Sequence, residues 1–348
     1  MLNALSSFYK IMNNVVEITD KTTWEEFLLS RPLLQTPFFQ SWNWGEMQQS
    51  LGNSIFRLGM YNGKILVGVC LVVEIKAKRA HYLHLRHGPV LKDLTHFDEF
   101  IHHIKKIAKD QNADFLRISP LFEKDTTDIG FFRKRGFRNA PIHNMDAENT
   151  WVLDLDSSEE DILKNMRKST RYLVRKAPGL NLDISQTSKE ENFEAFMKLY
   201  KDTSKRHGFV PHRGIREEFK VFSQNGEAIL FLAKYEGKVL SGAVIIFYGN
   251  QAVYHHGASA DEHKEIPAAY LIQWEAIKEA KKRGKKVYNF FGIVPPEKPK
   301  HPWQGLTLFK TGFGGRRVNF IHAQDLPLTP LYWKSYAIET IWRIKRGY

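Results

Sequence analysis

The sequence predicts an α/β (α+β) fold made of two tandem copies of one unit. Residues 56–73 and 230–247 match each other at an offset of 174. The elements expected after each segment follow in the same order. A Gly-Phe pair closes each series, and the two pairs lie 176 residues apart. A shared order at nearly one offset indicates an internal duplication.

Each copy opens with a β-hairpin. The first segment reads FRLGMYNGKILVGVCLVV and the second reads LFLAKYEGKVLSGAVIIF. In both, two apolar runs flank a short turn that ends in Gly-Lys, which is typical of a hairpin. Identical positions in the two copies include Tyr61 and Tyr235, Gly63 and Gly237, Lys64 and Lys238, Leu66 and Leu240, and Gly68 and Gly242.

The later elements also correspond. In chain order they are an aromatic strand that ends in His-Gly (82–88 and 253–257), a helix with a basic face (97–110 and 269–283), a short strand (113–119 and 285–293), and a helix or turn that runs into Gly-Phe (131–137 and 308–313). This order resembles the Gcn5-related acetyltransferase (GNAT) architecture. A fold of this kind does not by itself define a function.

The duplication divides the chain into two GNAT-like domains. We expect residues 1–146 to form the first domain and residues 147–315 the second, beginning with an alternating strand at 150–156. We expect residues 316–348 to return and complete the first domain. No heptad insertion is present, so we predict a compact form without a coiled-coil arm.

Composition limits the classes of partner. The 348 residues contain 51 Lys and Arg against 38 Asp and Glu, a net charge of +13. Such an excess favours a polyanionic partner, although a merely basic protein is the alternative. The one cysteine, Cys70, lies in an apolar run and excludes an internal disulfide. Neither a signal peptide nor a membrane span is expected, which predicts a cytoplasmic protein.

No metal or cofactor is expected. The histidines and the cysteine lack zinc-ligand spacing. The glycine-rich stretch TLFKTGFGG at 307–315 fits neither phosphate-binding glycine motif.

The second copy contains inserted helical sequence with a basic face. Residues 157–177 begin with Ser157 or Ser158 as an N-cap and then become basic. Three arginines lie four residues apart on one face with Lys168 beside them: Arg167, Arg171 and Arg175. This face is either a solvated surface or a phosphate-contacting stripe. A further helix is expected at 190–205, where His207-Gly208 is a stop signal, and we expect Arg206 and Arg213 on the loop that follows.

Several segments together resemble the Fem-type aminoacyltransferases. They are MRKSTRYLVRKA, KRHGFVPH, YHHGAS, PAAYLIQWEAIKEAKKRG, HPWQGLTLFKTGFGG and, in the first copy, RHGPV. The resemblance implies transfer of Gly, Ala or Ser from an aminoacyl-tRNA to the stem-peptide amine of a peptidoglycan precursor. The acceptor would be UDP-MurNAc-pentapeptide or its lipid-linked form.

The resemblance assigns roles to the Phe-Lys pair near the end of the second copy. Lys310 would stabilise the oxyanion of ester aminolysis or hold the terminal ribose. Phe309 would stack on the terminal adenine. The basic stripe at 167–175 would contact the tRNA. The alternative is that Lys310 caps a helix at the surface, as we expect of Lys134 in the first copy.

Acceptor contacts are implied at Arg213, Tyr254, His256, Gln48 and Arg206. The family pattern has a lysine at the place of Gln48, a tyrosine shortly after Arg213 where this chain has Arg216, Glu217 and Glu218, and an acid at the place of Ser119. These departures leave one phosphate contact and the general base unassigned.

Two other functions fit the same features. An acyl-CoA-dependent N-acyltransferase would share the duplicated fold, but its glycine-rich pyrophosphate loop is missing. A non-catalytic nucleic-acid-binding protein would need the basic helix and not Lys310. The C-terminal segment 330–348 has aromatic residues at helical spacing. It is expected either to dock on the first domain or to make a weak contact with the membrane surface.

Overall fold

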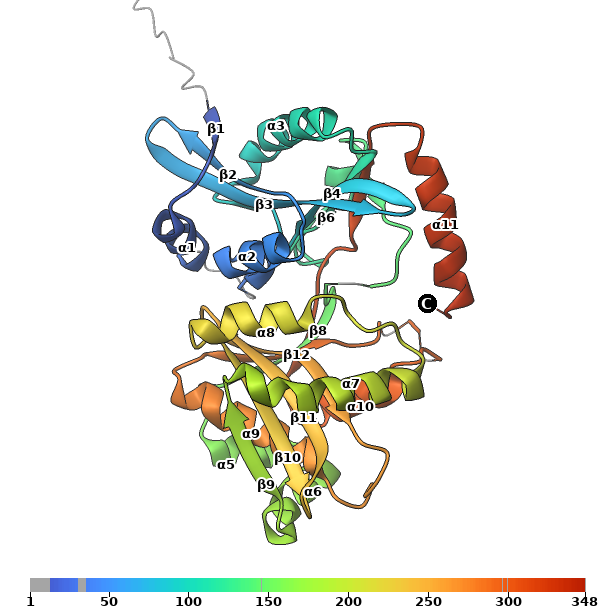
Figure 1. Cartoon of the computed structure of the whole chain (residues 1–348). Coiled ribbons are helices and arrows are strands. Elements are labelled where there is room, and N and C mark those ends of the chain that lie inside the picture. The colour runs from blue at the N-terminus through green and yellow to red at the C-terminus, as the bar shows by residue number, and fades with distance from the viewer. Residues whose placement is uncertain (1–12, 31–35, 145, 296, 299, 348) are drawn as a thin grey trace, which may run out of the picture.

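The computed structural model describes residues 13–347 apart from 31–35, 145, 296 and 299. The expectation about a signal peptide therefore falls mostly on residues 1–12, which lie outside the described part. The chain forms two stacked domains, and each is a twisted sheet with helices on both faces (Figure 1). The predicted fold class, a tandem GNAT-like duplication, is confirmed.

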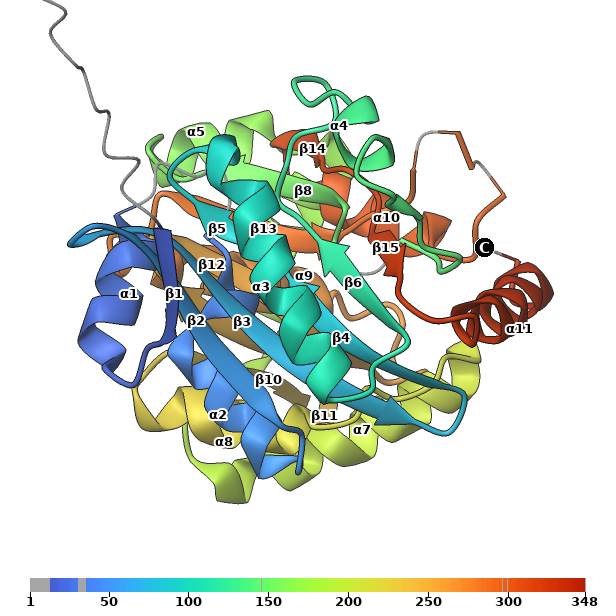
Figure 2. The ribbon, with the colours of Figure 1, turned by 90° about the horizontal axis from the view of Figure 1, so that it is seen from above.

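The first sheet contains seven strands in one path and an eighth, β5, paired with β3. Their order across the sheet is β1 (Asn13–Glu17), β2 (Ile55–Asn62), β3 (Ile65–Ala77), β4 (Ala80–Arg86), β6 (Phe115–Ser119), β15 (Gln324–Pro327) and β7 (Arg138–Asn139), with β5 at Val90–Leu91. Helices α1 (Lys21–Leu29) and α2 (Trp42–Ser50) lie on the face toward the second domain. Helix α3 (Phe97–Asp110) crosses the other face (Figure 2).

The second sheet contains seven strands. Their order is β14 (Arg316–Asn319), β8 (Asn149–Asp154), β13 (Val287–Gly292), β12 (Gln251–Ser259), β11 (Lys238–Tyr248), β10 (Ala228–Tyr235) and β9 (Asp183–Thr187). Helices α7 (Phe193–His207) and α8 (Ile215–Gln224) cover the face toward the first domain, and α9 (Ala268–Lys282) covers the opposite face.

The remaining helices are short or peripheral. They are α4 (Gly130–Arg133), α5 (Glu159–Asn165), α6 (Lys168–Lys176), α10 (Gln304–Thr311), α11 (Tyr332–Lys345) and the 3-10 turns η1 (Phe38–Gln40), η2 (Leu94–His96), η3 (Ala177–Leu180) and η4 (Glu190–Asn192). In the described part of the chain the longest helices have 15 residues, so a coiled-coil arm is absent there.

Each element of the predicted repeat is present in both copies and in the same order. The hairpins are β2–β3 and β10–β11, and the later pairs are β4 and β12, α3 and α9, β6 and β13, and α4 and α10. The amphipathic pattern accounts for α3: apolar side chains recur at three- and four-residue spacing and are buried, with Asp98 and Glu99 in the first turn.

The two copies exchange one strand. Strand β8 directly follows the first copy in sequence but lies in the second sheet, between β13 and β14. Strand β15 follows the second copy but lies in the first sheet, between β6 and β7. The expected return of the chain at residue 316 is wrong by a few residues, because Arg316–Asn319 pairs with β8 and the crossing to the first sheet comes after it.

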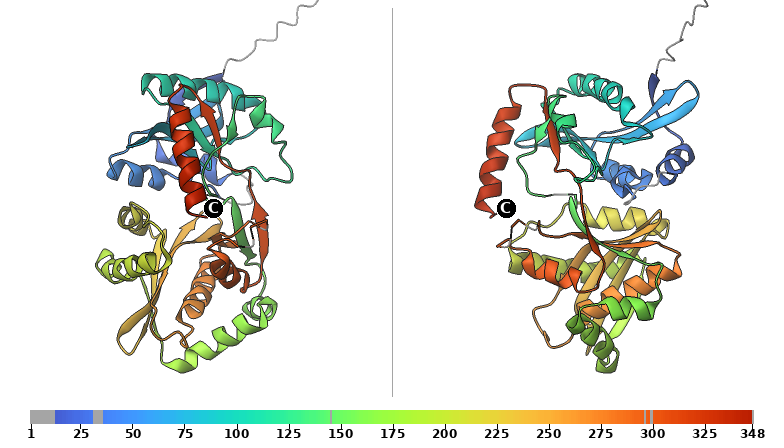
Figure 3. Two further views of the ribbon diagram at one scale, coloured as in Figure 1. Left: turned by 90° about the vertical axis from the view of Figure 1, so that its right-hand side faces the viewer. Right: turned by 180° about the vertical axis from the view of Figure 1, so that it is seen from behind.

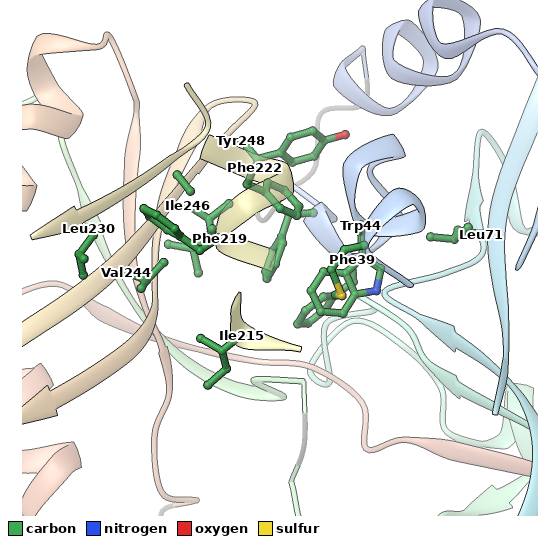
Figure 4. Packing of buried hydrophobic residues seen from close by; sticks show 14 of the residues in the cluster. Phe39, Trp44, Leu71, Ile215, Phe219, Phe222, Leu230, Val244, Ile246 and Tyr248 are labelled. Carbon is green, nitrogen blue, oxygen red and sulfur yellow. The ribbon is translucent and has the colours of Figure 1, made fainter. Parts of the chain in front are cut away.

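A shared apolar core joins the domains. Its largest cluster combines Phe39 and Trp44 of the first domain with Ile215, Phe219 and Phe222 of α8, which lie on the two sides of the interface (Figure 4). Polar contacts close the same interface: the Tyr248 hydroxyl donates to Glu25 Oε2 over 2.5 Å, and Asn43 Nδ2 donates to Glu227 Oε2 over 2.6 Å. Because interiors pack as tightly as crystals, this core holds the domains in one orientation.

Burial and helix length bear on two other predictions, those about Cys70 and about a membrane span. Cys70 is fully buried in β3. Of the helices in the described residues, none is long and apolar enough to cross a membrane.

Candidate active site where two strands of the second sheet diverge

The corresponding parallel strand pairs differ between the two copies. In the first sheet, β4 and β6 stay paired over five residues, from Tyr82 with Phe115 to Arg86 with Ser119. In the second sheet, β12 and β13 pair over three residues only, up to Val253 with Asn289. Beyond that point both strands continue but are no longer paired with each other, and Phe291 takes a left-handed backbone conformation with φ 64°. Side chains from both faces of the sheet can therefore approach the ends of β12 and β13.

Lys310 reaches this point from α10. Its Nζ donates to the carbonyl oxygen of Gly292, the last residue of β13, over 2.6 Å and lies 5.7 Å from the centre of the Tyr254 ring. Only 5% of the residue is exposed, and within the described residues no carboxylate pairs with it. Burial lowers the pKa of Lys310 to about 7. Lys134, its counterpart in the first copy, is exposed on the surface.

Tyr254 and Phe309 complete the surroundings of Lys310. The Tyr254 hydroxyl lies against Gly257, where a Cβ atom would come within 1.9 Å of the hydroxyl oxygen. Burial raises the pKa of Tyr254 to about 12, so the phenol remains a neutral donor. Phe309 is half-buried and packs edge-on against Tyr270, with ring centres 4.9 Å apart.

The predicted basic helix is two helices. Ser158 is the N-cap of α5, and the chain then breaks at Met166 and Arg167, so Arg167 precedes α6 instead of lying within it. The Arg167 guanidinium donates to Leu308 O over 3.0 Å and to Thr311 Oγ1 over 3.1 Å, which ties it to the helix that carries Lys310. The break separates Arg167 from the continuous stripe that we expected.

The other three cations of the stripe lie on α6. Arg171 Nη1 donates to Lys164 O over 2.7 Å. Lys168 and Arg175 are exposed, and Tyr172 beside them is 62% exposed. A basic helix with one exposed aromatic ring is chemically suited to a nucleic-acid backbone and a stacked base.

A second group of side chains lies on the face toward the first domain. A register shift in β12 pairs Val244 with His256 and Ile245 with Tyr254, which leaves His255 as an extra residue. Such a bulge reverses the alternation of side chains, so His255 and His256 both reach Glu218 of α8. The distances are 2.7 Å from His255 Nδ1 to Oε1 and 3.2 Å from His256 Nε2 to Oε2.

Burial governs the charges of this group. It lowers the pKa of His255 to about 4, which leaves that imidazole neutral at pH 7. Burial alone would raise the pKa of the Glu218 carboxyl, but the two rings against it bring this pKa well below its usual value. Glu218 is therefore a buried carboxylate.

Arg213 and Gln48 lie at the contact of α8 with α2. Arg213 is exposed just before α8, and its neighbour Gly214 packs so closely on Leu51 that a Cβ would lie 2.6 Å from that side chain. Gln48 is half-buried on α2 and accepts a hydrogen bond from Asn53 over 2.8 Å. The structure thus brings the two predicted phosphate-side residues to one interface.

Arg206 differs from expectation. It belongs to the last turn of α7 and is not on the loop. Its Nη2 donates to Ser259 O over 2.7 Å, and its Nε lies 3.8 Å from Asp261. These contacts tie α7 to the end of β12 and engage the guanidinium that we expected to bind the acceptor.

The end of the strand pair in the first copy is filled by its own side chains. Arg86 forms an ion pair with Asp146 and lies 3.5 Å from the centre of the Phe39 ring. Ser119, which replaces the expected acid, is buried. At the corresponding place in the first copy, Arg86 is paired with Asp146, and Lys134, the counterpart of Lys310, is exposed.

Sequence reasoning did not identify Glu218 or His255 as partners. A detectable signal was present in α8, whose apolar positions Ile215, Phe219 and Phe222 form one buried face. Glu218 falls on that face, and an acid on the buried face of a helix requires a partner. The bulge that turns His255 toward it depends on strand pairing and has no local sequence signal.

Comparison with known proteins adds four findings. The model of the FemAB family matches residues 19–131, 134–214 and 215–340. A lipid II:glycine glycyltransferase of Staphylococcus epidermidis is 21% identical over 309 residues, covering 68% of this chain and 74% of the relative. The crystal structure of FemX superposes with a TM-score of 0.78 at 20% identity, covering 92% of this chain and 99% of FemX. A tandem GNAT protein from the clavulanic acid biosynthesis pathway superposes with a TM-score of 0.59 at 11% identity, covering 92% and 99%.

Proposed function

Because this chain belongs to the FemAB family, we propose that it is an aminoacyltransferase that adds an amino acid to the stem peptide of a peptidoglycan precursor. The donor in this proposal is an aminoacyl-tRNA carrying Gly, Ala or Ser. The acceptor is UDP-MurNAc-pentapeptide or the lipid-linked precursor. The glycyltransferase relatives, named for lipid II, favour the lipid-linked form.

The observation that carries the proposal is the buried amino group of Lys310, which bonds Gly292 O at the diverging strands and has no carboxylate partner among the described residues. In the proposed reaction the acceptor amine attacks the ester carbonyl carbon, and the carbonyl oxygen becomes an oxyanion. The bond from that carbon to the ribose oxygen then breaks, an amide forms, and the proton lost by the amine leaves with the ribose hydroxyl or to solvent. A protonated Lys310 would stabilise the oxyanion, and low local polarity strengthens that interaction.

The donor and acceptor would approach from different sides. Phe309 and the basic helix with Lys168, Arg171 and Arg175 lie on the α9–α10 side, where we propose that the tRNA end binds. Arg167 acts there as a positioning residue for α10. The acceptor would bind on the interdomain side, with Arg213, Gln48 and His256 near it and Tyr254 close to the reacting ester.

A transfer assay tests this proposal. Radiolabelled Gly-, Ala- and Ser-tRNA are offered with UDP-MurNAc-pentapeptide, with the lipid-linked precursor in parallel, and with acetyl-CoA as an alternative donor. Label moving from one tRNA to either acceptor supports the proposal and identifies the amino acid. Transfer from acetyl-CoA alone would replace it with the acyl-CoA-dependent activity, and no transfer from any donor would leave a binding role.

We also propose that the enzyme acts in the cytoplasm at the inner face of the membrane, through α11. The inner face of this helix docks on the first domain: Tyr332 is buried, and Arg117 bonds Glu339 over 2.7 Å. The outer stripe exposes Trp333 (49%), Ile341 (53%) and Ile344 (66%), and α11 stands at the rim of the molecule (Figure 3).

Lys334 and Lys345 flank this stripe, and such a face suits an anionic lipid surface. Sedimentation with phosphatidylglycerol vesicles should be weakened by Ile341→Glu and not by Ile65→Glu, a 61% exposed isoleucine on the β2–β3 hairpin. Equal binding to neutral vesicles, or no effect of Ile341→Glu, would remove this contact from the proposal.

A further inference from the structure

Glu218, His255 and His256 place three metal-ligating groups together at the domain interface. One nitrogen of each histidine and a carboxylate oxygen of Glu218 lie within 4.8 Å of one another. All three side chains are at most 8% exposed. Imidazole nitrogen and carboxylate oxygen are ligands that Zn²⁺ takes in proteins.

The backbone is shaped to bring these groups together. Neighbouring residues of a regular strand point to opposite faces, so a His-His pair could present only one ring to α8. The bulge at His255 puts both rings on that face. Bulges of this kind re-aim side chains beside functional sites.

The Glu218 carboxyl has few partners. Glu218 is a buried carboxylate, and among the described residues its ion-pair partners are the two imidazoles alone. A buried carboxylate requires a compensating positive charge.

We propose that Glu218, His255 and His256 bind one Zn²⁺ ion between α8 and β12. The expectation of no metal rested on ligand spacing along the chain, whereas this proposal takes one ligand from a distant helix. Three protein ligands leave a coordination position open for water or a ligand oxygen. The His212 ring, whose centre lies 5.7 Å from that of His256, is the nearest additional imidazole. The ion would fix the start of α8 and thereby the position of Arg213.

Zinc binding to the full-length protein tests this proposal without any measurement of transfer. Protein stripped with a chelator and reloaded with Zn²⁺ is dialysed, and the metal is counted by mass spectrometry. Affinity is measured by competition with a chromophoric chelator. We expect one Zn²⁺ per wild-type chain and affinity at least about tenfold weaker in Glu218→Gln and in His256→Asn.

The chain offers a matched control in His263→Asn. His263 and Glu265 form an exposed pair 3.3 Å apart, and loss of this pair in His263→Asn should leave zinc binding unchanged. Thermal unfolding of wild type with and without Zn²⁺ adds a test that needs no variant, because binding to the native state raises Tm. A wild-type chain that holds no zinc against the chelator, or zinc retained in full by both variants, would overturn the proposal. Neither result would affect the proposed transfer reaction.

Discussion

The buried amino group of Lys310 makes a quantitative prediction about stability. Burial lowers the pKa of this group from 10.5 to about 7. Between these values the unfolded chain holds a proton that the folded chain has lost, so stability rises with pH across this window. The cost of burying the charge is fully present below pH 7 and disappears above 10.5. At about 1.36 kcal/mol per pKa unit, this cost is roughly 5 kcal/mol.

Lys310→Met removes the titrating group and with it this pH dependence. From pH 7 to pH 9 the wild type should gain about 2 kcal/mol of unfolding free energy relative to the variant. Urea unfolding at the two pH values measures the gain, and comparison with the variant cancels the contribution of other groups. Lys134→Met is the matched control, because Lys134 is exposed, and it should behave as wild type. An equal gain in wild type and Lys310→Met would refute the reasoning.

The same variant reports on catalysis. A cation that contacts only the transition state should affect turnover more than binding, so kcat should fall about 10²–10³-fold with little change in the KM for the acceptor. Lys134→Met should keep full activity. Unchanged turnover in a folded Lys310→Met protein would remove this lysine from the active site.

Three further substitutions, with Gly305→Ala as a control, test other parts of the structure. Arg213→Ala should raise the KM for UDP-MurNAc-pentapeptide about tenfold while kcat is retained, since a charge-assisted hydrogen bond is lost; steady-state kinetics separates the two. Gly257→Ala should lower stability by about 1–3 kcal/mol, because the added methyl group collides with the Tyr254 hydroxyl. Gly305→Ala, with open space around it, should not lower stability in the same thermal scan. Phe219→Ala should cost about 3–5 kcal/mol in denaturant unfolding, because it opens a cavity in the core that joins the domains.

The architecture could be predicted because the sequence contains two copies of the same series of elements. Hairpin residues such as Gly63 and Gly237 have local turn signals, and both take positive φ. Lys310 could be chosen as a candidate catalytic residue because it follows Phe309 in a segment that resembles the Fem-type family. Its burial and its bond to Gly292 depend on the divergence of β12 and β13, which sequence periodicity does not report.

Features that depend on distant contacts could not be predicted. The break at Met166 and Arg167 has no glycine or proline to mark it, and Arg167 is instead held by α10. The positions of β8 and β15 are set by pairing partners far away in the chain. The contact between Glu218 and His255 depends on the bulge in β12, which turns His255 toward α8.

The exchanged strands affect how this chain folds while it is being synthesised. On the ribosome, the first sheet emerges without β15 and keeps a gap between β6 and β7 until residues 324–327 are synthesised. At typical translation speeds that interval lasts roughly 10–40 s. During it, β6 presents unpaired backbone groups that could recruit another chain. Two separate molecules trading these strands would form a swapped dimer, so the present chain has the topology of such a dimer after fusion of its genes. The first half is then not a separable module, because residues 1–146 alone lack β15.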